Sequence, residues 1–325
     1  PPDPGSEKKK HETNENIFDR RTRPDQLIVI GGGTIGMEMA QAHRRLGSKV
    51  TVIEGAKAMG KDDPELAAVV LERLREEGIE IIEGAQAEEI SEKDGQITVK
   101  TPGGSYTGSH LLMAVGRKVN IDKLNLEAAN VEYTRGGVKV GADLKSTNKK
   151  VYAIGDAAGG LQFTHVAGYH AGIIIRSALF GLPAKAKTSH IPWATYTDPE
   201  LAQVGMTEAQ AKKEHGINLE VVRFPYHEND RAIAEGKTTG LIKVMVVKGK
   251  PVGASIAGAM AGELIGMWAM AIANGLKMSA IANTVLPYPT IAEINKRAAG
   301  AYFSPRLFES DKVKKVVGFV QRFLP

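Results

Sequence analysis

The sequence predicts an α/β fold built on a parallel sheet, because apolar runs of strand length alternate with segments of helical periodicity. An apolar strand at residues 27–30 breaks into three glycines, and a helix-forming segment at 37–46 closes at Gly47. A second strand at 50–54 follows and completes a βαβ unit. Alternation of this kind is typical of a parallel sheet with helices packed on it.

A second helix continues the alternation. Asp63 and Pro64 mark a helix start, after which residues 66–74 keep helical spacing. Gly78 stops this helix, and residues 79–82 return as a strand.

The segment that follows has the pattern of a hairpin rather than a βαβ unit. Residues 95–115 carry hairpin-like strands around a turn at 102–104 and finish in an apolar run at 111–115. We therefore expect the first domain to end near residue 122.

Composition indicates a globular protein of more than one domain. The chain has 325 residues, 42% apolar and 24% charged, which exceeds one compact core and argues against disorder, a fibre or a membrane channel. Cysteine is absent. Its absence excludes a disulfide scaffold, a thiolate metal site, a cysteine nucleophile and a dithiol redox centre within these residues.

The positive charge does not predict a nucleic-acid partner. The net charge is +5, but the basic runs at 8–10, 20–23 and 312–315 are short. No aromatic residues interleave with them as a nucleic-acid platform requires, so a solvated surface is the favoured interpretation.

No membrane span or export signal is predicted. The longest uncharged apolar stretch in the C-terminal half, 264–273, is well short of the about 20 residues that cross a bilayer, and we expect it to be a buried helix. The N-terminal residues contain no apolar signal core, so the cytoplasm is the expected compartment.

The first glycine cluster is the clearest chemical motif. Gly31, Gly33 and Gly36 form a G-x-G-x-x-G sequence between a strand and a helix. Gly31 permits the turn, Gly33 lets backbone N–H groups approach a pyrophosphate, and Gly36 lets helix and strand pack closely. The motif predicts a Rossmann-like dinucleotide site, whereas the plain alternative is a tight α/β turn without a ligand.

An acid at the end of the second strand predicts which dinucleotide is bound. Glu54 lies 18 positions after Gly36, where a carboxylate accepts hydrogen bonds from an adenosine ribose and repels a 2′-phosphate. NAD(H) is therefore predicted over NADP(H). The alternative is an ordinary surface carboxylate, with Lys57 or Lys61 accommodating a phosphate.

A second acid follows another glycine. Residues 147–156 are expected to form a short strand that ends at Gly155 and Asp156, followed by small residues. Asp156 at a strand end can reach a ligand hydroxyl. It can equally be the N-cap of a helix that begins near His165.

The C-terminal half has its own strand and helix pattern. Residues 242–247 and 252–257 are expected to pair as strands across 248–251. Small residues between 258 and 266 let a helix approach another backbone closely, which suits a subunit contact and equally suits internal packing.

Neither a metal site nor hydrolase chemistry is predicted. His165 and His170 are five residues apart and lie off a common helical face. Ser177, Ser189 and Ser255 lack the context of a nucleophile elbow.

Four motifs together resemble one enzyme family. They are residues 31–36, 114–117, 152–156 and 196–200, and the resemblance covers nearly all of residues 11–300 in the family's order. The sequence is similar to the class I pyridine nucleotide-disulfide oxidoreductases, which include dihydrolipoamide dehydrogenase, glutathione reductase and mercuric reductase.

The resemblance implies the domain organisation. The expected fold is a Rossmann-like nucleotide-binding domain plus part of a second one, followed by an α+β dimerisation domain. The expected segments are a linker at 1–22, the NAD-binding domain at 23–122, the remaining part of the FAD-binding domain at 123–189, and the dimerisation (interface) domain at 190–325.

The resemblance also implies roles for residues around the nicotinamide. Glu38 matches the acid that borders the nicotinamide, and Gly116 and Arg117 belong to the motif near the nicotinamide nucleotide.

On the flavin side, Asp156 matches the aspartate that binds the ribityl or pyrophosphate region of FAD. Thr164, His165 and Ala167 match the stretch whose helix N-terminus points at the isoalloxazine ring. A helix dipole there favours negative charge on a reduced flavin.

Two departures from the family limit the functional prediction. The family's first nucleotide-binding segment, with its own glycine motif and its pair of cysteines, has no counterpart in these residues. The expected explanation is the C-terminal portion of a longer flavoprotein, and a naturally shortened relative is the alternative.

The second departure is Tyr288, which stands where the lipoamide and glutathione enzymes have a histidine paired with an acid that matches Glu293. Tyrosine, with a pKa of about 10, is a poor base at neutral pH. A tyrosine here is similar to mercuric reductases, where it lies near a bound metal. The alternative is an aromatic filler between two prolines.

The resemblance therefore implies an FAD-dependent NAD(P)H oxidoreductase, similar to dihydrolipoamide dehydrogenase and active in cell redox homeostasis. Hydride would pass from NADH to flavin and then to an unknown small-molecule acceptor, in a homodimer. The alternative is a non-catalytic nucleotide-binding homodimer. Tyr288 and Glu293 are the catalytic candidates.

Overall fold

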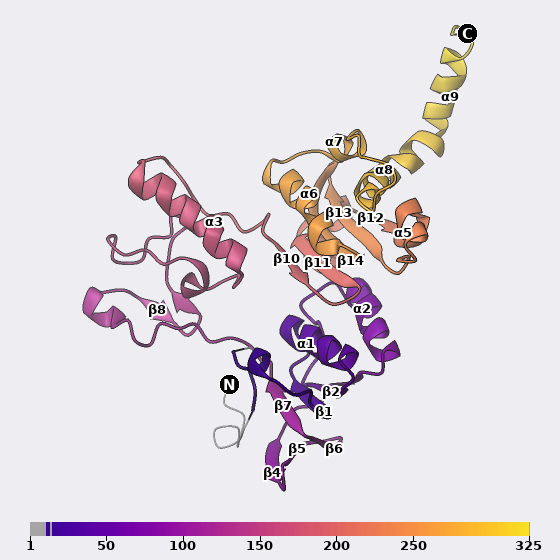
Figure 1. The fold of residues 1–325 in the computed structure, drawn as a ribbon. Coiled ribbons are helices and arrows are strands. Elements are labelled where there is room, and N and C mark those ends of the chain that lie inside the picture. Colours follow the sequence, from indigo (N-terminus) through magenta and orange to yellow (C-terminus); the bar gives the residue numbers. More distant parts are fainter. Residues whose placement is uncertain (1–10, 14, 325) are drawn as a thin grey trace. The chain divides into compact units, whose positions relative to one another are not determined.

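A computed structural model describes residues 11–13 and 15–324, which form two compact units (Figure 1). The first unit combines the chain up to Val115 with the chain from Pro192 onward, and the second is Gly116–Ile191. The basic run at 8–10 and much of the predicted linker lie outside the described residues.

The nucleotide-binding part of the first unit is centred on a parallel sheet. Its strands are β1 (Gln26–Ile30), β2 (Lys49–Glu54), β3 (Glu80–Glu83) and β7 (His110–Met113), in the order β3-β2-β1-β7. All three neighbouring pairs are parallel. The parallel sheet predicted from the alternating pattern is confirmed.

Two helices cover this sheet, and their boundaries follow from local sequence. Helix α1 (Thr34–Arg45) begins directly after the glycine cluster, and α2 (Pro64–Glu76) begins at the predicted Asp63–Pro64 start. The Asp63 carboxylate accepts the Glu65 backbone N–H at 3.1 Å, which caps α2 as expected for this residue type. The apolar faces of both helices are buried against β1 and β2.

The predicted hairpin is also present. Strands β4 (Glu89–Lys93), β5 (Gln96–Thr101) and β6 (Gly104–Gly108) form an antiparallel sheet in sequence order. The chain then enters β7, at the edge of the parallel sheet.

The C-terminal part of the first unit contains a five-stranded antiparallel sheet in the order β10-β11-β14-β13-β12. The predicted pairing of residues 242–247 with 252–257 is confirmed. The five strands are β10 (Pro192–Thr195), β11 (Glu200–Gly205), β12 (Leu219–Pro225), β13 (Leu241–Val247) and β14 (Lys250–Gly258).

Several helices pack against this antiparallel sheet, and the last described helix packs mainly against the one before it. Trp268, on the predicted buried segment 264–273, is fully buried and donates its indole N–H to Asn295 Oδ1 at 2.7 Å. The helices are α4 (Glu208–His215), α5 (Asp230–Ala234), α6 (Ala261–Ala273), α7 (Met278–Ala282), α8 (Glu293–Phe308) and α9 (Asp311–Val320), with 3-10 turns at Gly216–Asn218 and Tyr226–Glu228.

A buried ion-pair cluster joins the two parts of the first unit. Lys243 on β13 is 3% exposed, and its ammonium lies 2.9 Å from Asp63 Oδ2 and 2.8 Å from Glu65 Oε2. Glu208 on α4 is a third partner of Lys243. Arg223 on β12 adds a second cation, 2.8 Å from Glu65 and 3.0 Å from Glu208. Because Asp63 caps α2, this cluster holds that helix to the antiparallel sheet.

The second unit has little regular structure and a small core. Six buried apolar residues form its cluster: Val119, Ile121, Leu126, Val131, Val138 and Ala153. Its elements are η3 (Leu126–Ala129), β8 (Tyr133–Thr134), β9 (Gly137–Val138), η4 (Gly155–Ala158), α3 (Thr164–Ile174) and a π-helical turn at Ile175–Leu179.

The strand predicted at 147–156 is wrong. Tyr152 makes a single bridge with Lys145, and residues 155–158 form a 3-10 turn. The cause is local, because the Ser146 hydroxyl donates to the Asn148 carbonyl and accepts the Asn148 backbone N–H, which closes a turn there. The predicted strand is therefore reduced to the single β-bridge at Tyr152.

Within residues 11–13 and 15–324, every helix is too short or too polar to cross a bilayer.

Candidate functional site

The glycine turn between β1 and α1 contains glycines of two kinds. Gly31 has φ +107°, and a Cβ there would lie 2.4 Å from the Ala114 carbonyl oxygen. A Cβ on Gly36 would lie 1.9 Å from the Gly31 carbonyl oxygen. The packing of the protein itself therefore requires glycine at both positions.

Gly33 is different, because its absent side chain faces open space. A Cβ at Gly33 would meet no described atom within 4 Å, and its φ of −81° is accessible to any residue. Gly33 is the N-cap of α1 and, having no side chain, leaves the first helical N–H groups uncapped. The structure therefore offers room and hydrogen-bond donors for an anionic group at this turn, which fits a pyrophosphate.

Glu54, at the end of β2, lies against the same turn. Its carboxylate accepts the Gly32 N–H at 2.7 Å and the Ala56 N–H at 2.8 Å. Two backbone donors thus fix the carboxylate beside the glycines, and its remaining lone pairs can accept ribose hydroxyls. Lys57 and Lys61 are exposed a few residues further on.

Glu38 lies one turn into α1 and is tied to the C-terminal part of the chain. Its Oε1 accepts the Tyr196 backbone N–H at 2.7 Å. Partial burial raises the pKa of Glu38 above its ordinary value, although the hydrogen bond from Tyr196 opposes that shift. Carboxylates with raised pKa values are found at functional sites as well as in structural networks.

The second unit contains the residues expected near the flavin. Arg117 donates to Asp156 Oδ2 at 2.7 Å and to the Gln162 carbonyl at 3.1 Å. Arg117, which is expected near the nicotinamide, and Asp156, which is expected near the flavin, therefore form an ion pair within the second unit. Gly116, which precedes Arg117, has φ +130°, and a Cβ there would meet no described atom within 4 Å.

Asp156 is not a helix N-cap. It lies in the 3-10 turn η4, and α3 begins after Phe163, whose side chain supplies no cap. The alternative in which Asp156 caps the helix near His165 is wrong, because five residues separate the η4 turn from α3 and the N-cap of α3 is Phe163. The Asp156 carboxylate keeps lone pairs beyond the one that receives Arg117.

The N-terminus of α3 carries the three other residues expected near the flavin. Thr164, His165 and Ala167 all lie in its first turns, and the His165 ring stacks on Phe163 with centroids 5.2 Å apart. A Cβ on Gly155, which has φ +57°, would lie 2.8 Å from the Ala167 Cβ. The η4 turn and the start of α3 therefore pack closely, and the Asp156 carboxylate and the positive end of the α3 dipole fit part of a flavin site.

His170 is a residue that sequence reasoning considered only as a metal ligand. It is buried, and its Nδ1 accepts the Gly155 backbone N–H at 3.1 Å. Burial lowers its pKa. His170 thus holds the glycine that precedes Asp156, and no periodic signal in the sequence announces such a contact.

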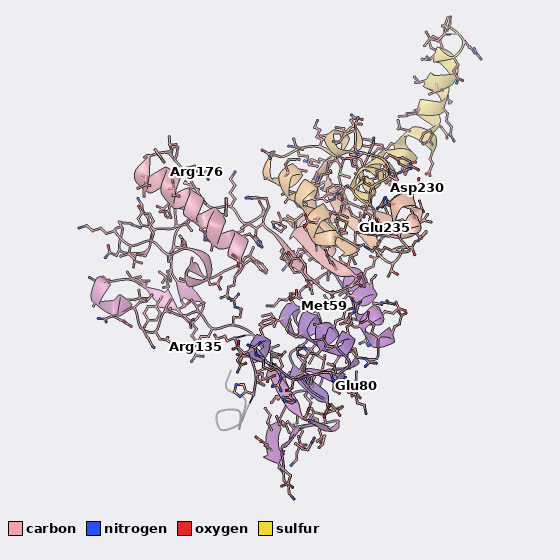
Figure 2. All side chains as sticks on the ribbon, in the orientation of Figure 1. Met59, Glu80, Arg135, Arg176, Asp230 and Glu235 are labelled. Carbon is pink, nitrogen blue, oxygen red and sulfur yellow. The ribbon has the colours of Figure 1, made fainter. Side chains whose placement is uncertain are left out.

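Tyr288 lies in the loop before α8 and is 67% exposed. Its hydroxyl donates to Asp230 Oδ2 at 2.8 Å, and this hydrogen bond raises the pKa of the phenol. Asp230 begins the short helix α5 (Figure 2), whose N-cap Asn229 also donates to the Thr290 carbonyl at 3.2 Å. The negative charge of Glu293, the first residue of α8, also acts on Tyr288. The Tyr288 hydroxyl is therefore held in place by its hydrogen bond to Asp230.

The site residues divide between the two units. Gly31, Gly33, Gly36, Glu38 and Glu54 gather around α1 in the first unit, which also contains Tyr288 and Glu293. Gly116, Arg117, Asp156, Thr164, His165 and Ala167 belong to the second unit. Among the described residues, no cluster of three or more His, Asp or Glu side chains is arranged to hold a metal ion.

Comparison with known proteins defines the class of protein. Residues 2–171 match the family described as pyridine nucleotide-disulphide oxidoreductase, and residues 191–299 match the dimerisation domain of that family. The chain therefore belongs to the pyridine nucleotide-disulphide oxidoreductase family. The family and the α/β fold with a dimerisation domain, both predicted from the sequence, are confirmed.

Curated relatives are longer than this chain. It is 36% identical over 299 residues to a mercuric reductase of Bacillus cereus, which covers 89% of the chain and 47% of the relative. It is 35% identical over 284 residues to a dihydrolipoyl dehydrogenase of Geobacillus stearothermophilus, covering 85% and 60%. The chain spans about half the length of the curated relatives it matches.

Solved structures show the same fold in flavoproteins. The HOCl-induced flavoprotein disulfide reductase RclA of Escherichia coli, as its Cu(II) complex, has a TM-score of 0.82 and 29% identity. That match covers 88% of this chain and 67% of RclA. LpdA of Mycobacterium tuberculosis has a TM-score of 0.83 and 27% identity, over 89% and 64%. The relatives are oxidoreductases, in agreement with the enzyme class predicted from the sequence.

Proposed function

We propose that this chain binds NADH and serves an FAD-dependent NAD(P)H oxidoreductase similar to dihydrolipoamide dehydrogenase. When both cofactors are bound, the nicotinamide supplies hydride to the flavin, which passes electrons to a small-molecule acceptor. The observation that supports this proposal most is Gly33, the one glycine of the turn whose missing side chain leaves room for a ligand.

The glycine turn and Glu54 bind different parts of the nucleotide. The uncapped N–H groups at the start of α1 bind the pyrophosphate, with Gly33 allowing its close approach. Glu54, held by Gly32 and Ala56, accepts the ribose hydroxyls and repels a 2′-phosphate. NAD(H) is therefore bound in preference to NADP(H).

Glu38 in the first unit borders the nicotinamide end, and Gly116 and Arg117 in the second unit belong to the motif that the resemblance assigns to the nicotinamide nucleotide. The Glu38 carboxylate keeps one oxygen on the Tyr196 N–H, so its orientation is fixed while its other oxygen can accept from a carboxamide. The backbone of Gly116 has open space beside it.

Asp156 and the start of α3 hold part of the FAD. Asp156 binds the ribityl or pyrophosphate region, and the α3 N-terminus with Thr164, His165 and Ala167 faces the ring. These residues make up only part of a complete flavin site, so we expect the chain alone to hold FAD weakly.

Tyr288 and Glu293 act at the acceptor. Asp230 raises the pKa of the Tyr288 phenol, so Tyr288 is a proton donor or an orienting group and not a base. The chain forms a homodimer through its dimerisation domain, and the dimer brings Tyr288 of one subunit to the flavin of the other. The cytoplasm is the proposed compartment.

A specific observation supports a second candidate. Arg117 already engages the carboxylate of Asp156, and these residues contain no cysteine. A non-catalytic nucleotide-binding homodimer is therefore the alternative function.

Calorimetric titration with NADH and with NADPH tests the proposal. We expect tighter binding of NADH, and a Gly33→Ala variant should bind it at least about tenfold more weakly because the new methyl group occupies the space of the phosphate. Equal or reversed affinities for the two nucleotides would show that Lys57 or Lys61 dominates. Undiminished binding by the Gly33→Ala variant would reject the site.

Gel filtration of the same protein with added FAD tests the dimer and the partial flavin site. The proposal expects a dimer that loses the flavin absorbance on the column. A clean monomer contradicts the dimer, and a persistent flavin band contradicts the expectation of a partial site.

A further inference from the structure

Helix α9 (Asp311–Val320) buries none of its residues within the described chain. It begins at Ser310, whose hydroxyl caps the first turn, and it follows α8 at the end of the ribbon (Figure 1). Backbone hydrogen bonds from Gln321 through Leu324 to the preceding turn continue its coil. Such a helix receives little stabilisation from its own fold, because helices in proteins are stabilised mainly by packing of an apolar face.

That helix nevertheless has a strongly apolar face. At 100° per residue, positions i, i+3, i+4, i+7 and i+11 share one side. Phe319 and Phe323 widen this face, with ring centroids 4.9 Å apart and exposures of 63% and 71%. The residues aligned on this apolar face are Val313, Val316, Val317, Val320 and Leu324.

The remaining surface of the helix is basic. Lys315 and Arg322 lie on the side opposite the valines, Lys314 lies at one border of the valine face, and Lys312 lies at the other border, on the side of Phe319 and Phe323. Asp311 is the one acid of residues 311–324, so this segment has a net charge of +3. An apolar arc with phenylalanines, bordered by lysine and arginine, is the pattern of a helix that lies in a membrane interface.

We propose that α9 docks the protein on the surface of an anionic phospholipid bilayer. The valines and phenylalanines enter the boundary between headgroups and acyl chains, and the lysines and the arginine contact the lipid phosphates and carboxylates. Ten residues extend about 15 Å, half of the about 30 Å of a hydrocarbon core, so the helix lies in the surface plane.

Charge favours lipid over a second copy of the helix. Two paired α9 helices would bring like charges together along their borders, and about 15 Å of contact is short for an independent helix pair. An anionic surface instead neutralises the same charges, each basic side chain contributing about fivefold to binding.

Vesicle flotation with the whole chain tests the proposal. Vesicles of phosphatidylcholine alone should leave the protein behind, and vesicles with about 30% phosphatidylserine should carry it. Val316→Asp/Val320→Asp should reduce the bound fraction at least about tenfold, because two charges enter the apolar face. Lys314→Gln/Lys315→Gln should weaken binding to the anionic vesicles about 30-fold at low salt.

A matched control removes equal charge elsewhere. Lys212 and Lys213 are exposed on α4, and Lys212→Gln/Lys213→Gln should bind vesicles as the wild type does. NADH affinity of every variant serves as the check of folding.

Three results would overturn the proposal. The first is equal binding to neutral and anionic vesicles. The second is full flotation of the Val316→Asp/Val320→Asp variant. The third is a Val316→Asp/Val320→Asp variant that binds vesicles normally and changes only the oligomeric state in lipid-free sedimentation. The last would assign the apolar face to a second copy of the chain.

Discussion

Two turns carry an acid beside a glycine, one in each unit, and they are held in different ways. In the first unit, backbone N–H groups of the turn itself hold Glu54, and its partners Gly32 and Ala56 belong to one βαβ segment. In the second unit, Asp156 is held by Arg117, 39 residues earlier. Its neighbour Gly155 bonds to His170, 15 residues later.

The difference between the two turns shows which contacts make each of them rigid. The unit that contains the first turn has several large clusters of buried residues and the Lys243 ion-pair cluster. The second turn rests on six buried apolar residues and a few polar contacts. We therefore expect substitutions in the first unit to change its global stability and those in the second to change local order.

The largest effect is expected at Lys243, which supports the first turn from a distance. Lys243→Met leaves the buried Asp63 carboxylate without its cation, which costs about 3–5 kcal/mol when a buried pair is broken. Urea unfolding would measure the loss. Amide exchange should show no added opening in Gly116–Ile191.

Arg223→Met is the matched control, since its side chain is 43% exposed and shares Glu65 and Glu208 with Lys243. Exposed pairs contribute at most about 1 kcal/mol. Similar losses from both variants would contradict a special role for the buried cation.

The Lys243 ion-pair cluster also predicts how the stability of the protein changes at low pH. Arg223, followed by Lys243, lowers the pKa of Glu65 to about 2. A lowered carboxyl pKa contributes stability that is fully present above the ordinary value of about 4.5 and is lost as the pH falls toward 2. Unfolding at decreasing pH should show this loss, and Glu65→Gln should flatten it. An unchanged pH profile in Glu65→Gln would contradict the assignment.

The hydrogen bond from Tyr288 to Asp230, at the proposed acceptor site, is a third contact of a carboxylate that can be compared with the two turns. Tyr288 depends on Asp230, 58 residues earlier, as Asp156 depends on Arg117. In a protein that holds FAD, Tyr288→Phe should lower turnover about 100-fold, as for loss of a positioned proton donor. Stopped-flow reduction by NADH should not change.

Asp230→Asn keeps an oxygen for the Tyr288 hydroxyl but removes the charge, so a smaller loss of turnover is expected. If Tyr288 only fills the space between two prolines, phenylalanine would turn over acceptor as fast as tyrosine.

The glycines of the first turn provide the next largest effect. A methyl group on Gly36 meets the Gly31 carbonyl oxygen, so Gly36→Ala should lower the free energy of unfolding by about 1–3 kcal/mol. Gly33→Ala should lower it by less than about 1 kcal/mol, because its methyl group faces open space and only the N-cap changes. Thermal unfolding of both variants would measure this, and equal destabilisation would remove the distinction between the two glycines.

Local patterns explain what the sequence predicted correctly. Strand β1, helix α1 and the capped start of α2 depend on neighbours within a few residues, and periodicity and cap chemistry reveal these. The position of Glu54 beside the glycines followed from the same βαβ geometry.

Contacts between distant residues explain the rest. The bond from Tyr196 to Glu38 spans 158 residues and the one from Lys243 to Asp63 spans 180, and no single-sequence pattern pairs such positions. The wrong strand before Gly155 has the same origin, because strand formation depends on a pairing partner that periodicity does not specify.

The smallest effect should appear at the second turn. His170 Nδ1 accepts the Gly155 N–H, which requires the neutral imidazole, and burial lowers the pKa of His170. A lowered histidine pKa contributes stability that is fully present above the unfolded value of about 6.5 and is lost as the pH falls through the folded value. Protonation replaces the Nδ1 lone pair by a donor and opens the bond to Gly155.

Amide exchange of residues 153–172, corrected for intrinsic rates, should therefore increase between pH 7.5 and 5.5, while the exchange of β1 and α1 stays constant. His170→Gln offers an oxygen acceptor that does not titrate, so this variant should lose the pH dependence. Its retention would mean that another group controls the second turn. The first turn serves as the internal control, because backbone N–H groups and a carboxylate hold it without an imidazole.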